Sequence, residues 1–497
     1  MRAHEAGALH GDIGGRSPSW LRTPEDVNAL VPMLWPSNVA RGEDGSLRVA
    51  GIDVRRLAEE FGTPAYIFDE ADFRARCRDF RDSFAGSDQR GTAAGSDQRG
   101  TAAGSDQRGT AAGSDQRGTA AGAAVFYAAK AFCAKAVIRI VAEEGLHLDV
   151  CTGGELAVAL AAGMPPARIK LHGNNKSVTE LARAIDAEVG WIVVDSFDEI
   201  ARLSGLAADR GVRPRVMVRV TVGVEAHTHE FIATAHEDQK FGFSLASGAA
   251  FEAAQRIARD ERLELAGLHS HIGSQIFDTS GFEVSARRVL SLADALRTQL
   301  GLEVPELDLG GGFGIAYTTQ DDPATAGDLA SRMFKIVEQE CAVRRLAVPH
   351  LSIEPGRALV GPAMFTLYEV GTVKDVDGIR TYVSVDGGMS DNIRTALYDA
   401  TYSATVANRR SAAEPMLARV VGKHCEAGDV VVKDEFLPAD VQPGDLIAVP
   451  GTGAYCRSMA SNYNHVPRPP VVAVGEGEPR VIVRRETEDD LLALDVG

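Results

Sequence analysis

The feature that most constrains this chain is a series of eight short apolar runs that alternate with stretches of helical character. Strands that alternate with helices form parallel sheets, and about eight such units make a closed (β/α)8 barrel of the TIM type. We therefore predict an α/β fold with a barrel in the middle of the chain. Its strands are expected at residues 125–129, 146–150, 168–171, 191–194, 215–220, 265–268, 307–309 and 350–353.

A different pattern begins after residue 358, where runs rich in Val, Thr and Tyr are separated by Gly, Asp and Pro. This pattern is typical of β-sheet. We predict a C-terminal β-sheet or β-barrel domain at residues 358–497, to which residues 38–68 add a strand or two. The barrel is expected to cover residues 69–357. Residues 1–37 lack the pattern of a secretory signal and are expected to form a loose tail.

Residues 86–121 interrupt the barrel with four identical copies of the nine-residue unit Gly-Ser-Asp-Gln-Arg-Gly-Thr-Ala-Ala. The unit has no apolar face at the helical or the strand period, so we predict a disordered surface loop. A repeat-based calcium site is disfavoured because each copy has one carboxylate, whereas Ca²⁺ takes six or more oxygens. The identical copies indicate a tandem duplication, which is tolerated because long loops add little to the free energy of closure.

The charge and the cysteines exclude several classes of protein. A net charge of −17 disfavours nucleic acid and anionic membranes as partners. No apolar run is long enough to span a membrane. The six cysteines are scattered without Cys-x-x-Cys spacing, which favours reduced thiols over disulfides or a zinc site. We therefore expect a cytoplasmic protein without metal ligands.

Polar or glycine residues lie at or near the ends of the predicted strands, at the face of a barrel where active sites form. They are Lys130, Asp149, His172, Asp195, Arg219, His271, Gly310 and Glu354. A lysine at a strand end can form a Schiff base, and a histidine can stack on a flat ring. A glycine turn can hold a phosphate, and a carboxylate can keep a ring nitrogen protonated. This combination indicates a pyridoxal 5'-phosphate site.

Two of these residues define the predicted chemistry. Lys130 is predicted to hold the cofactor as a Schiff base, the alternative being a solvated lysine at a strand end. Lys135 is expected to be an exposed helical charge. Glu354 is predicted to keep the pyridine nitrogen protonated, so that the ring accepts the electron pair left by departing carbon dioxide. His269 is expected on the opposite side of its strand, in a structural role.

Phosphate binding is predicted at the backbone N–H groups of Gly310, Gly311 and Gly312, together with the hydroxyl of Ser274. Glycine permits close approach of the backbone, and a strand-to-helix turn offers the positive end of a helix dipole. A plain turn is the alternative for this glycine run.

In their order and spacing, the motifs of this chain resemble the meso-diaminopimelate decarboxylase family. The fold of this family is similar to those of alanine racemase and eukaryotic ornithine decarboxylase. The match extends from about residue 38 to the C-terminus, with the repeat insert as the one large departure. The matching motifs are Tyr-Ala-Ala-Lys-Ala, Asp-Val-Cys-Thr-Gly-Gly-Glu-Leu, His-Gly-Asn-Asn-Lys, His-Ile-Gly-Ser-Gln, Glu-Pro-Gly-Arg, Cys-Glu-Ala-Gly-Asp and Gly-Ala-Tyr.

The resemblance implies further roles around the cofactor. His271 would stack on the ring face, and Tyr455 would contact both cofactor and substrate. Asp149 would lie near the Schiff-base lysine and influence its protonation. For Asp149, a helix N-cap before Glu155 remains an alternative.

The resemblance also implies a homodimer with shared active sites. Cys425 would be a proton donor near the reacting carbon, and Glu426 would meet the distal ammonium of the substrate. In this family the Cys-Glu segment enters the active site of the neighbouring subunit. Cys456 is expected to be inert packing.

The choice of substrate can be argued from charge. An ornithine decarboxylase must meet a distal ammonium with carboxylates, whereas diaminopimelate carries a second carboxylate that needs a cation. This chain offers Arg357, Arg394 and Tyr398, and the family uses an arginine and a tyrosine at positions matching the last two to hold substrate. A surface salt bridge is the alternative for either arginine.

We expect decarboxylation of meso-2,6-diaminopimelate to L-lysine and carbon dioxide, the last step of lysine biosynthesis. A decarboxylase of another basic amino acid, of the ornithine or arginine type, and a racemase on the same fold are alternatives. The arginines and the Cys-Glu segment argue against both. A non-catalytic cofactor-binding homologue is a third alternative, although it would normally have lost Lys130 or the Cys-Glu segment.

Overall fold

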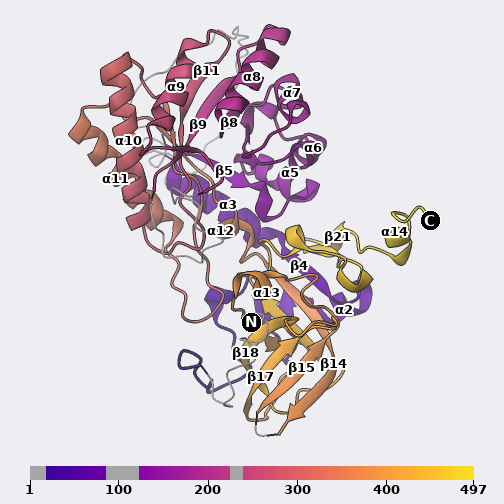
Figure 1. The fold of residues 1–497 in the computed structure, drawn as a ribbon. Helices are drawn as coiled ribbons and strands as arrows, with labels where there is room; N and C mark the ends of the chain where they lie inside the picture. The colour runs from indigo at the N-terminus through magenta and orange to yellow at the C-terminus, as the bar shows by residue number, and fades with distance from the viewer. Residues whose placement is uncertain (1–17, 86–121, 224–238, 378) are drawn as a thin grey trace, which may run out of the picture.

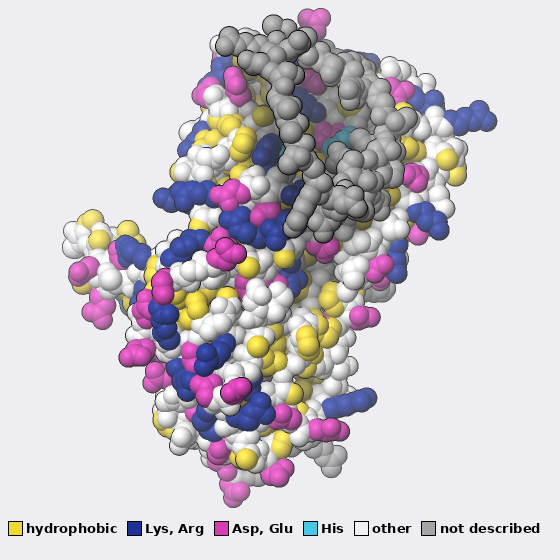
Figure 2. Space-filling view, turned by 180° about the vertical axis from the view of Figure 1, so that it is seen from behind, with side chains coloured by type: hydrophobic (Ala, Val, Ile, Leu, Met, Phe, Trp, Pro, Cys, Tyr) yellow, Lys and Arg dark blue, Asp and Glu magenta, His cyan; other side chains and the backbone are white. Residues whose placement is uncertain are grey.

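The computed structural model describes residues 18–85, 122–223, 239–377 and 379–497. Figure 1 shows two parts, a barrel surrounded by helices and a sheet-rich part formed largely by the C-terminal third of the chain. Within these described ranges, no helix combines the length and the apolar character needed to cross a bilayer. Acidic and basic side chains are interspersed over the face shown in Figure 2, so its described surface offers no extended basic area to a polyanion.

Eight parallel strands close into a barrel because the last strand, β13, pairs with the first, β5. The other seven neighbouring pairs are also parallel. The predicted barrel is confirmed, and each strand coincides with one of the eight apolar runs. The strands are β5 (Ala124–Ala128), β6 (His147–Val150), β7 (Ile169–Leu171), β8 (Trp191–Val194), β9 (Arg215–Thr221), β11 (Glu264–His269), β12 (Glu306–Asp308) and β13 (His350–Ile353), with the short β10 (Phe243–Ser244) beside β9.

Helices cover the outside of the barrel (Figure 1). The longer helices bury apolar side chains, as α7 does with Leu181, Ala184 and Ile185, whereas all four residues of the short α12 are buried. Local capping fixes where α7 begins, because Ser177 and Glu180 form a reciprocal capping box. The helices are α3 (Glu70–Phe84), α5 (Lys135–Glu143), α6 (Gly153–Ala162), α7 (Val178–Asp186), α8 (Phe197–Arg210), α9 (Ala249–Arg259), α10 (Ser280–Leu300), α11 (Ala326–Arg344) and α12 (Arg357–Val360).

The sheet-rich part is organised around the long strand β14 (Met364–Val376). Its first half pairs antiparallel with β4 and β19, and its second half pairs antiparallel with β15. The predicted C-terminal sheet is therefore confirmed. Its other elements are β4 (Ala65–Asp69), β15 (Arg380–Val385), β16 (Thr405–Val406), β17 (Pro415–Val421), β18 (Val430–Pro438), β19 (Leu446–Pro450), β20 (Val471–Val474), β21 (Arg480–Val483), α13 (Arg394–Tyr398) and α14 (Glu488–Leu492).

The segment before the barrel contributes to two sheets. Strand β4 lies between β14 and β20 in the large sheet. A strand at Leu47–Val49 also lies in this segment, but it belongs to a separate three-stranded sheet. That sheet is tied to the large one by the hydrogen bond from Leu47 N to Ala407 O, 2.7 Å long. It consists of β1 (Val39–Arg41), β2 (Leu47–Val49) and β3 (Ile52–Asp53), and α2 (Val54–Phe61) follows it.

The described part of the predicted loose tail is packed against the sheet-rich part. Leu34 and Trp35 are buried, and the Trp35 ring lies edge-on to that of Phe365 at 5.9 Å. Apolar side chains in this segment explain the difference, because covering the sheet removes them from water. Residues 1–17 and the repeat insert at 86–121 lie outside the described residues. The insert joins α3 to the start of β5, whereas Lys130 follows the end of β5.

The barrel and the sheet-rich part meet closely at Gly453. A Cβ atom at this position would lie 1.7 Å from the carbonyl oxygen of Val360 in α12, so only glycine fits. Two residues later, the N–H of Tyr455 donates to the carbonyl of Ala131, beside Lys130 (2.9 Å). This junction brings side chains of the sheet-rich part to the ends of the barrel strands.

Candidate active site

A cavity of about 540 Å³ lies at the carboxyl ends of the barrel strands, where the barrel meets the sheet-rich part. This is the end of such a barrel where active sites form. Of the predicted site residues that line it, four follow barrel strands and three come from the sheet-rich part. Together these predicted site residues are Lys130, His271, Ser274, Arg357, Arg394, Tyr398 and Tyr455.

A second cavity, of about 570 Å³, lies between residues 20–35, the loop at 318–320 and the segment at 403–405. None of the predicted site residues lines it. We therefore place the chemistry in the slightly smaller cavity, which contains the candidate nucleophile.

Lys130 lies in the 3-10 turn Ala129–Ala131 directly after β5, and its amine faces the cavity. Surrounding protein lowers the pKa of Lys130 by burial, but the carboxylates of Asp149 and Glu354 outweigh this effect and the net shift is upward. The free amine is therefore held as an ammonium with acidic groups beside it. Lys135 is exposed at the start of α5, as predicted.

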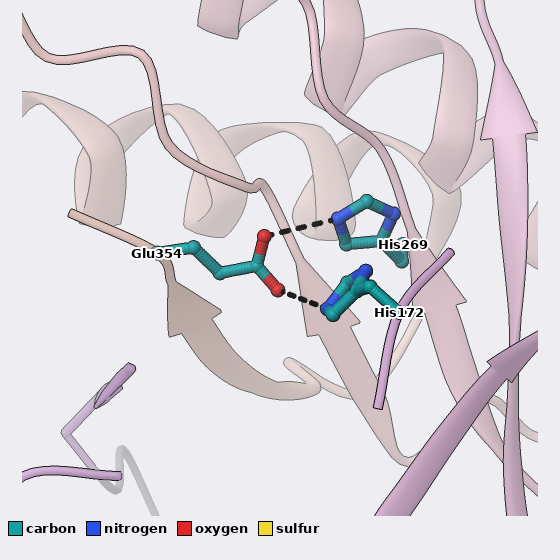
Figure 3. A group of neighbouring side chains, drawn as sticks. All are labelled: His172, His269 and Glu354. Atoms are coloured by element: carbon teal, nitrogen blue, oxygen red, sulfur yellow. Dashed lines mark hydrogen bonds and ion pairs between the residues drawn. The ribbon is translucent and has the colours of Figure 1, made fainter. Parts of the chain in front are cut away.

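Glu354, at the end of β13, is enclosed by two histidines from other strands (Figure 3). Its Oε2 lies 3.3 Å from Nε2 of His269, and its Oε1 lies 2.8 Å from Nε2 of His172. Burial alone would raise the pKa of Glu354, but the two histidines hold it well below its usual value. Burial lowers the pKa of His172 to about 3, so this ring is neutral. Glu354 is therefore an anion that contacts a neutral His172 ring, with Lys170 Nζ 3.9 Å from its Oε1.

Several buried polar atoms around this carboxylate lack a hydrogen-bond partner within the described protein. Oε1 of Glu354 and Nε2 of His172 are among them, because their 2.8 Å contact lacks hydrogen-bond geometry, and so is Oδ1 of Asp149. Such atoms are rare in folded proteins and indicate a missing polar partner. The protonated nitrogen of a flat heterocycle would satisfy Glu354 while leaving the ring within reach of Lys130. The residues therefore fit the ring of pyridoxal 5'-phosphate.

Ligand atoms of His172, His269 and Glu354 lie within 4.8 Å of one another, a spacing that a metal ion could use. The 2.8 Å contact between Glu354 and His172 is shorter than the separation of about 3.3 Å between two ligands of a tetrahedral zinc ion. Direct contact between the side chains thus describes this cluster better than metal coordination.

The prediction that His269 lies on the opposite side of its strand is wrong. Side chains two residues apart in an extended chain point to the same face, so His269 faces the barrel interior and reaches Glu354. His271 lies just beyond the strand, where its Nδ1 accepts a hydrogen bond from Gly311 N (3.2 Å). Burial and the nearby Lys130 hold the pKa of His271 well below its usual value, so a neutral ring lines the cavity.

The turn after β12 requires glycine for steric reasons. A Cβ on Gly311 would lie 2.2 Å from the carbonyl oxygen of Glu354, and one on Gly312 would lie 2.5 Å from that of Gly273. Gly312 also has a positive φ of 111°. The turn can therefore pass close to the ends of β11 and β13 only because it lacks side chains.

The prediction of a strand-to-helix turn at these glycines is wrong, because α11 begins only at Ala326. The N–H of Gly310 already donates to Asp308 Oδ1 (2.7 Å), and that of Gly311 donates to His271. Phosphate binding at this turn stays a prediction, which now rests on close backbone approach and on Ser274 rather than on a helix dipole.

The alternative role of Asp149 as a helix cap is also wrong. The N-cap of α6 is Thr152, whose hydroxyl accepts a hydrogen bond from Glu155 N. Asp149 is instead buried with its Oδ1 3.7 Å from Nε2 of His172, and burial holds its pKa well above the usual value. Asp149 and Lys130 interact electrostatically, as the predicted position of Asp149 near the lysine requires.

Two buried arginines line the cavity without an acidic partner. Arg357 and Arg394 are each 6% exposed, and neither forms an ion pair within the described ranges. The alternative interpretation, in which either arginine forms a surface salt bridge, is therefore wrong. Arg357 donates to the hydroxyls of Tyr317 and Ser274, and Arg394 donates to that of Tyr402. A buried cation without an anion is unfavourable, so this region of the cavity favours a negatively charged ligand.

Cys425 and Glu426 do not line the cavity of their own chain. They are exposed in the loop between β17 and β18. Buried Asp429 fixes this loop by accepting hydrogen bonds from Met389 N (2.6 Å) and His424 N (2.7 Å). The loop therefore presents both side chains outward in a defined conformation. Their role in a neighbouring subunit stays a prediction.

Sequence reasoning assigned no role to His172, Tyr317 or Tyr402, all of which contact predicted site residues. The position of His172 at the end of a predicted strand was a usable signal. The two tyrosines lie in irregular segments and had no such signal.

A family model described as the pyridoxal binding domain of pyridoxal-dependent decarboxylases matches residues 114–361. The chain is 54% identical to a diaminopimelate decarboxylase of Mycobacterium tuberculosis over 475 residues, covering 94% of this chain and 98% of the relative. It is 43% identical to one of Bacillus subtilis over 456 residues, covering 92% and 96%.

Diaminopimelate decarboxylases are also found among the solved structures that this chain resembles. A diaminopimelate decarboxylase from M. jannaschii in complex with L-lysine superposes with a TM-score of 0.81 at 30% identity, over 94% of this chain and 99% of that one. A lysine/ornithine decarboxylase from Vibrio vulnificus complexed with cadaverine is 19% identical over 85% and 98% of the two chains, with a TM-score of 0.66. At that identity the second likeness concerns the fold alone.

Proposed function

This chain belongs to the diaminopimelate decarboxylase family, and we propose that it converts meso-2,6-diaminopimelate to L-lysine and carbon dioxide with pyridoxal 5'-phosphate. This reaction is the last step of lysine biosynthesis. The proposal rests on Arg357 and Arg394, two buried arginines in the cavity that contains Lys130. Neither forms an ion pair within the described ranges. A substrate with two carboxylates would supply both missing anions.

The cofactor would be held by Lys130, His271, Glu354 and Tyr455, with Asp149 near the lysine and its phosphate at Ser274, Gly310, Gly311 and Gly312. When bound, it supplies an electron-accepting ring that stabilises the electron pair released as carbon dioxide departs. Glu354, held as an anion, would keep a proton on the ring nitrogen. The neutral ring of His271 would cover one face of the cofactor and exclude water from it.

The substrate would be oriented by Arg357, Arg394 and Tyr398, with Arg394 on the distal carboxylate. Orientation matters because the carboxylate that leaves must lie where the ring can accept its electrons. Tyr455 would contact both cofactor and substrate. The Arg357 guanidinium lies 4.8 Å from the Tyr455 ring centroid, which supports a shared contact region.

Cys425 and Glu426 would act in the cavity of a second copy of the chain. Their exposure on a fixed loop supports this reading. Cys425 would return a proton to the carbon that loses carbon dioxide, and Glu426 would meet the distal ammonium. The functional unit would then be a cytoplasmic homodimer.

Residues 69–357 would act as the cofactor-binding domain, and residues 38–68 with 358–497 as the domain that supplies Arg394, Tyr398 and Tyr455. The pairing of β4 with β14 supports the assignment of the N-terminal strands. A decarboxylase for ornithine or arginine is less well supported, because those substrates have one carboxylate for two unpaired arginines.

The test is to incubate the cofactor-loaded protein with meso-diaminopimelate and to measure carbon dioxide and L-lysine. Equal amounts of the two products are expected. L-ornithine and L-arginine serve as competing substrates. Faster release of carbon dioxide from either of them would overturn the proposal.

A further inference from the structure

The two arginines are oriented by tyrosines of the chain itself. Arg357 donates from Nη1 to the hydroxyl of Tyr317, and Arg394 donates from Nη1 to the hydroxyl of Tyr402. The Arg394 guanidinium also lies 4.8 Å from the centroid of the Tyr317 ring. Each cation is thus held by at least one phenol.

The two tyrosines form one unit across the junction of the barrel and the sheet-rich part. Tyr317 follows β12, whereas Tyr402 lies between α13 and β16. Their ring centroids are 5.0 Å apart, and the rings cross at 74°, a favourable edge-to-face arrangement. Both are buried, and their hydroxyls accept hydrogen bonds from the arginines; that of Tyr402 also lies 3.6 Å from Cys456 Sγ.

The surrounding backbone fixes this unit from both sides. Ser403 donates to the carbonyl of Tyr317 (3.2 Å), which ties the segment of one tyrosine to that of the other. Ala404 N donates to the carboxylate of Glu435 (3.1 Å), and Tyr317 N donates to Asp321 (2.9 Å). The tyrosines therefore have little freedom to follow a displaced arginine.

A phenol has one property that a carboxylate partner lacks. Both accept a hydrogen bond from a guanidinium, but the neutral phenol leaves the positive charge uncompensated. Burial holds the pKa of Tyr402 well above its usual value, so its hydroxyl stays neutral. An acidic partner in the same place would orient Arg394 and also compete with a ligand carboxylate.

We propose that Tyr317 and Tyr402 are positioning residues that orient Arg357 and Arg394 for the two carboxylates of the ligand while leaving the charge of both arginines available. The inference rests on the proposed function for the identity of the ligand. It adds specificity determinants that do not touch the reacting atoms.

The test compares two ligands that differ only by a carboxylate. Dissociation constants of L-lysine and cadaverine are measured from the change in absorbance of the cofactor-loaded protein, which requires no turnover. In Tyr402→Phe the dissociation constant of L-lysine should rise about tenfold, as expected for loss of one hydrogen bond to a charged group. That of cadaverine should stay within twofold of the parent.

Tyr382→Phe is the matched control, since it removes a hydroxyl from β15 in the same part of the molecule, outside the cavity lining. It should change neither constant. Unchanged L-lysine binding in Tyr402→Phe, or equal weakening of both ligands, would overturn the proposal. If Tyr402→Phe does not fold, the same two dissociation constants are measured for Tyr317→Phe, and the same outcomes support or overturn the proposal.

The proposed function is tested separately in the same series. If the parent releases no carbon dioxide from meso-diaminopimelate, the proposed function fails, whereas the ratio of the two dissociation constants still tests the tyrosines. If the parent is active and the ratio does not change in the variants, only the positioning role fails.

Discussion

The candidate site contains two charged regions of opposite sign. In the cofactor region, the anion of Glu354 is enclosed by His172 and His269. In the substrate region, the cations of Arg357 and Arg394 are held by phenols. Lys170 Nζ lies 3.9 Å from Oε1 of Glu354, whereas neither arginine forms an ion pair within the described ranges. The arginines can therefore bind a ligand that supplies the missing anion.

The two regions differ in where their residues come from. The histidines and Glu354 all follow or belong to barrel strands, so the barrel alone can assemble the cofactor region. The substrate region needs Arg357 and Tyr317 from the barrel and Arg394 and Tyr402 from the sheet-rich part. Cofactor binding and substrate selection should therefore respond to different mutations.

The largest effect is expected from a mutation that disrupts the cofactor region. Lys130→Ala should lower kcat by about three orders of magnitude or more, because it removes the nucleophile. The parent protein should be yellow and should bind the cofactor irreversibly at Lys130 after borohydride treatment. Mass spectrometry of the digested protein locates the label. Full activity in Lys130→Ala would rule out this chemistry.

Arg394→Ala should break the substrate region while leaving the cofactor region intact. Removing one partner of a buried charged contact should reduce transition-state binding of meso-diaminopimelate by about 2–5 kcal/mol, measured as kcat/KM. The absorbance of the bound cofactor should match that of the parent. Parental kinetics in the variant would remove Arg394 from the site.

A mixture of two inactive variants tests whether a second chain completes the site. Lys130→Ala and Cys425→Ala chains, allowed to exchange subunits, should regain up to about a quarter of parental activity, because half of the dimers are hybrids with one intact site of two. Absence of recovery despite confirmed hybrid dimers would place Lys130 and Cys425 in one chain's site, or Cys425 outside it.

The pH dependence of stability tests whether His172 in the cofactor region is neutral. The pKa of His172 is about 3 in the folded chain and about 6.5 when unfolded, so below pH 6.5 only the unfolded state gains this proton. Its contribution should reduce stability by about 1.4 kcal/mol per pH unit as the pH falls from 6 to 4. Urea unfolding of the cofactor-free protein at pH 7 and pH 5 measures it. His172→Gln should lose about 2 kcal/mol less than the parent; identical losses would contradict a neutral His172.

The smallest effect is expected outside both regions. Deleting residues 86–112 leaves one repeat between α3 and β5, and Lys130 follows the other end of β5. Activity should stay within twofold, and stability should change by about 1 kcal/mol because loop closure depends on the logarithm of length. Decarboxylation by the deletion variant measures the effect. A folded but inactive variant would connect the repeats to the site.

The barrel could be predicted because each of its strands is a distinct apolar run that ends in a polar or glycine residue. Lys130 and Glu354 were recognisable for the same reason, since a strand end determines which face they reach. His269 was misjudged although its spacing from His271 carried the information. The helix expected at the glycine turn was wrong because a strand end does not fix where the next helix begins.

Other contacts could not be read from the sequence. Tyr317 and Tyr402 are 85 positions apart in segments without periodicity, and only the packing of two domains brings their rings within 5.0 Å. The direct contact of His172 with Glu354 likewise depends on the closure of the barrel. Strand patterns predict which residues reach the cavity, but not which of them meet across it.

The close approach of Gly453 to Val360 bears on how selectivity for ligand length could evolve. The spacing between the guanidinium groups depends on how one domain packs against the other, and Gly453 lets the two backbones pass close together at Val360. A side chain at position 453 would separate the domains and lengthen the gap that a dicarboxylic acid must bridge. Homologues could thus change the preferred carbon-chain length without altering any residue that touches the ligand.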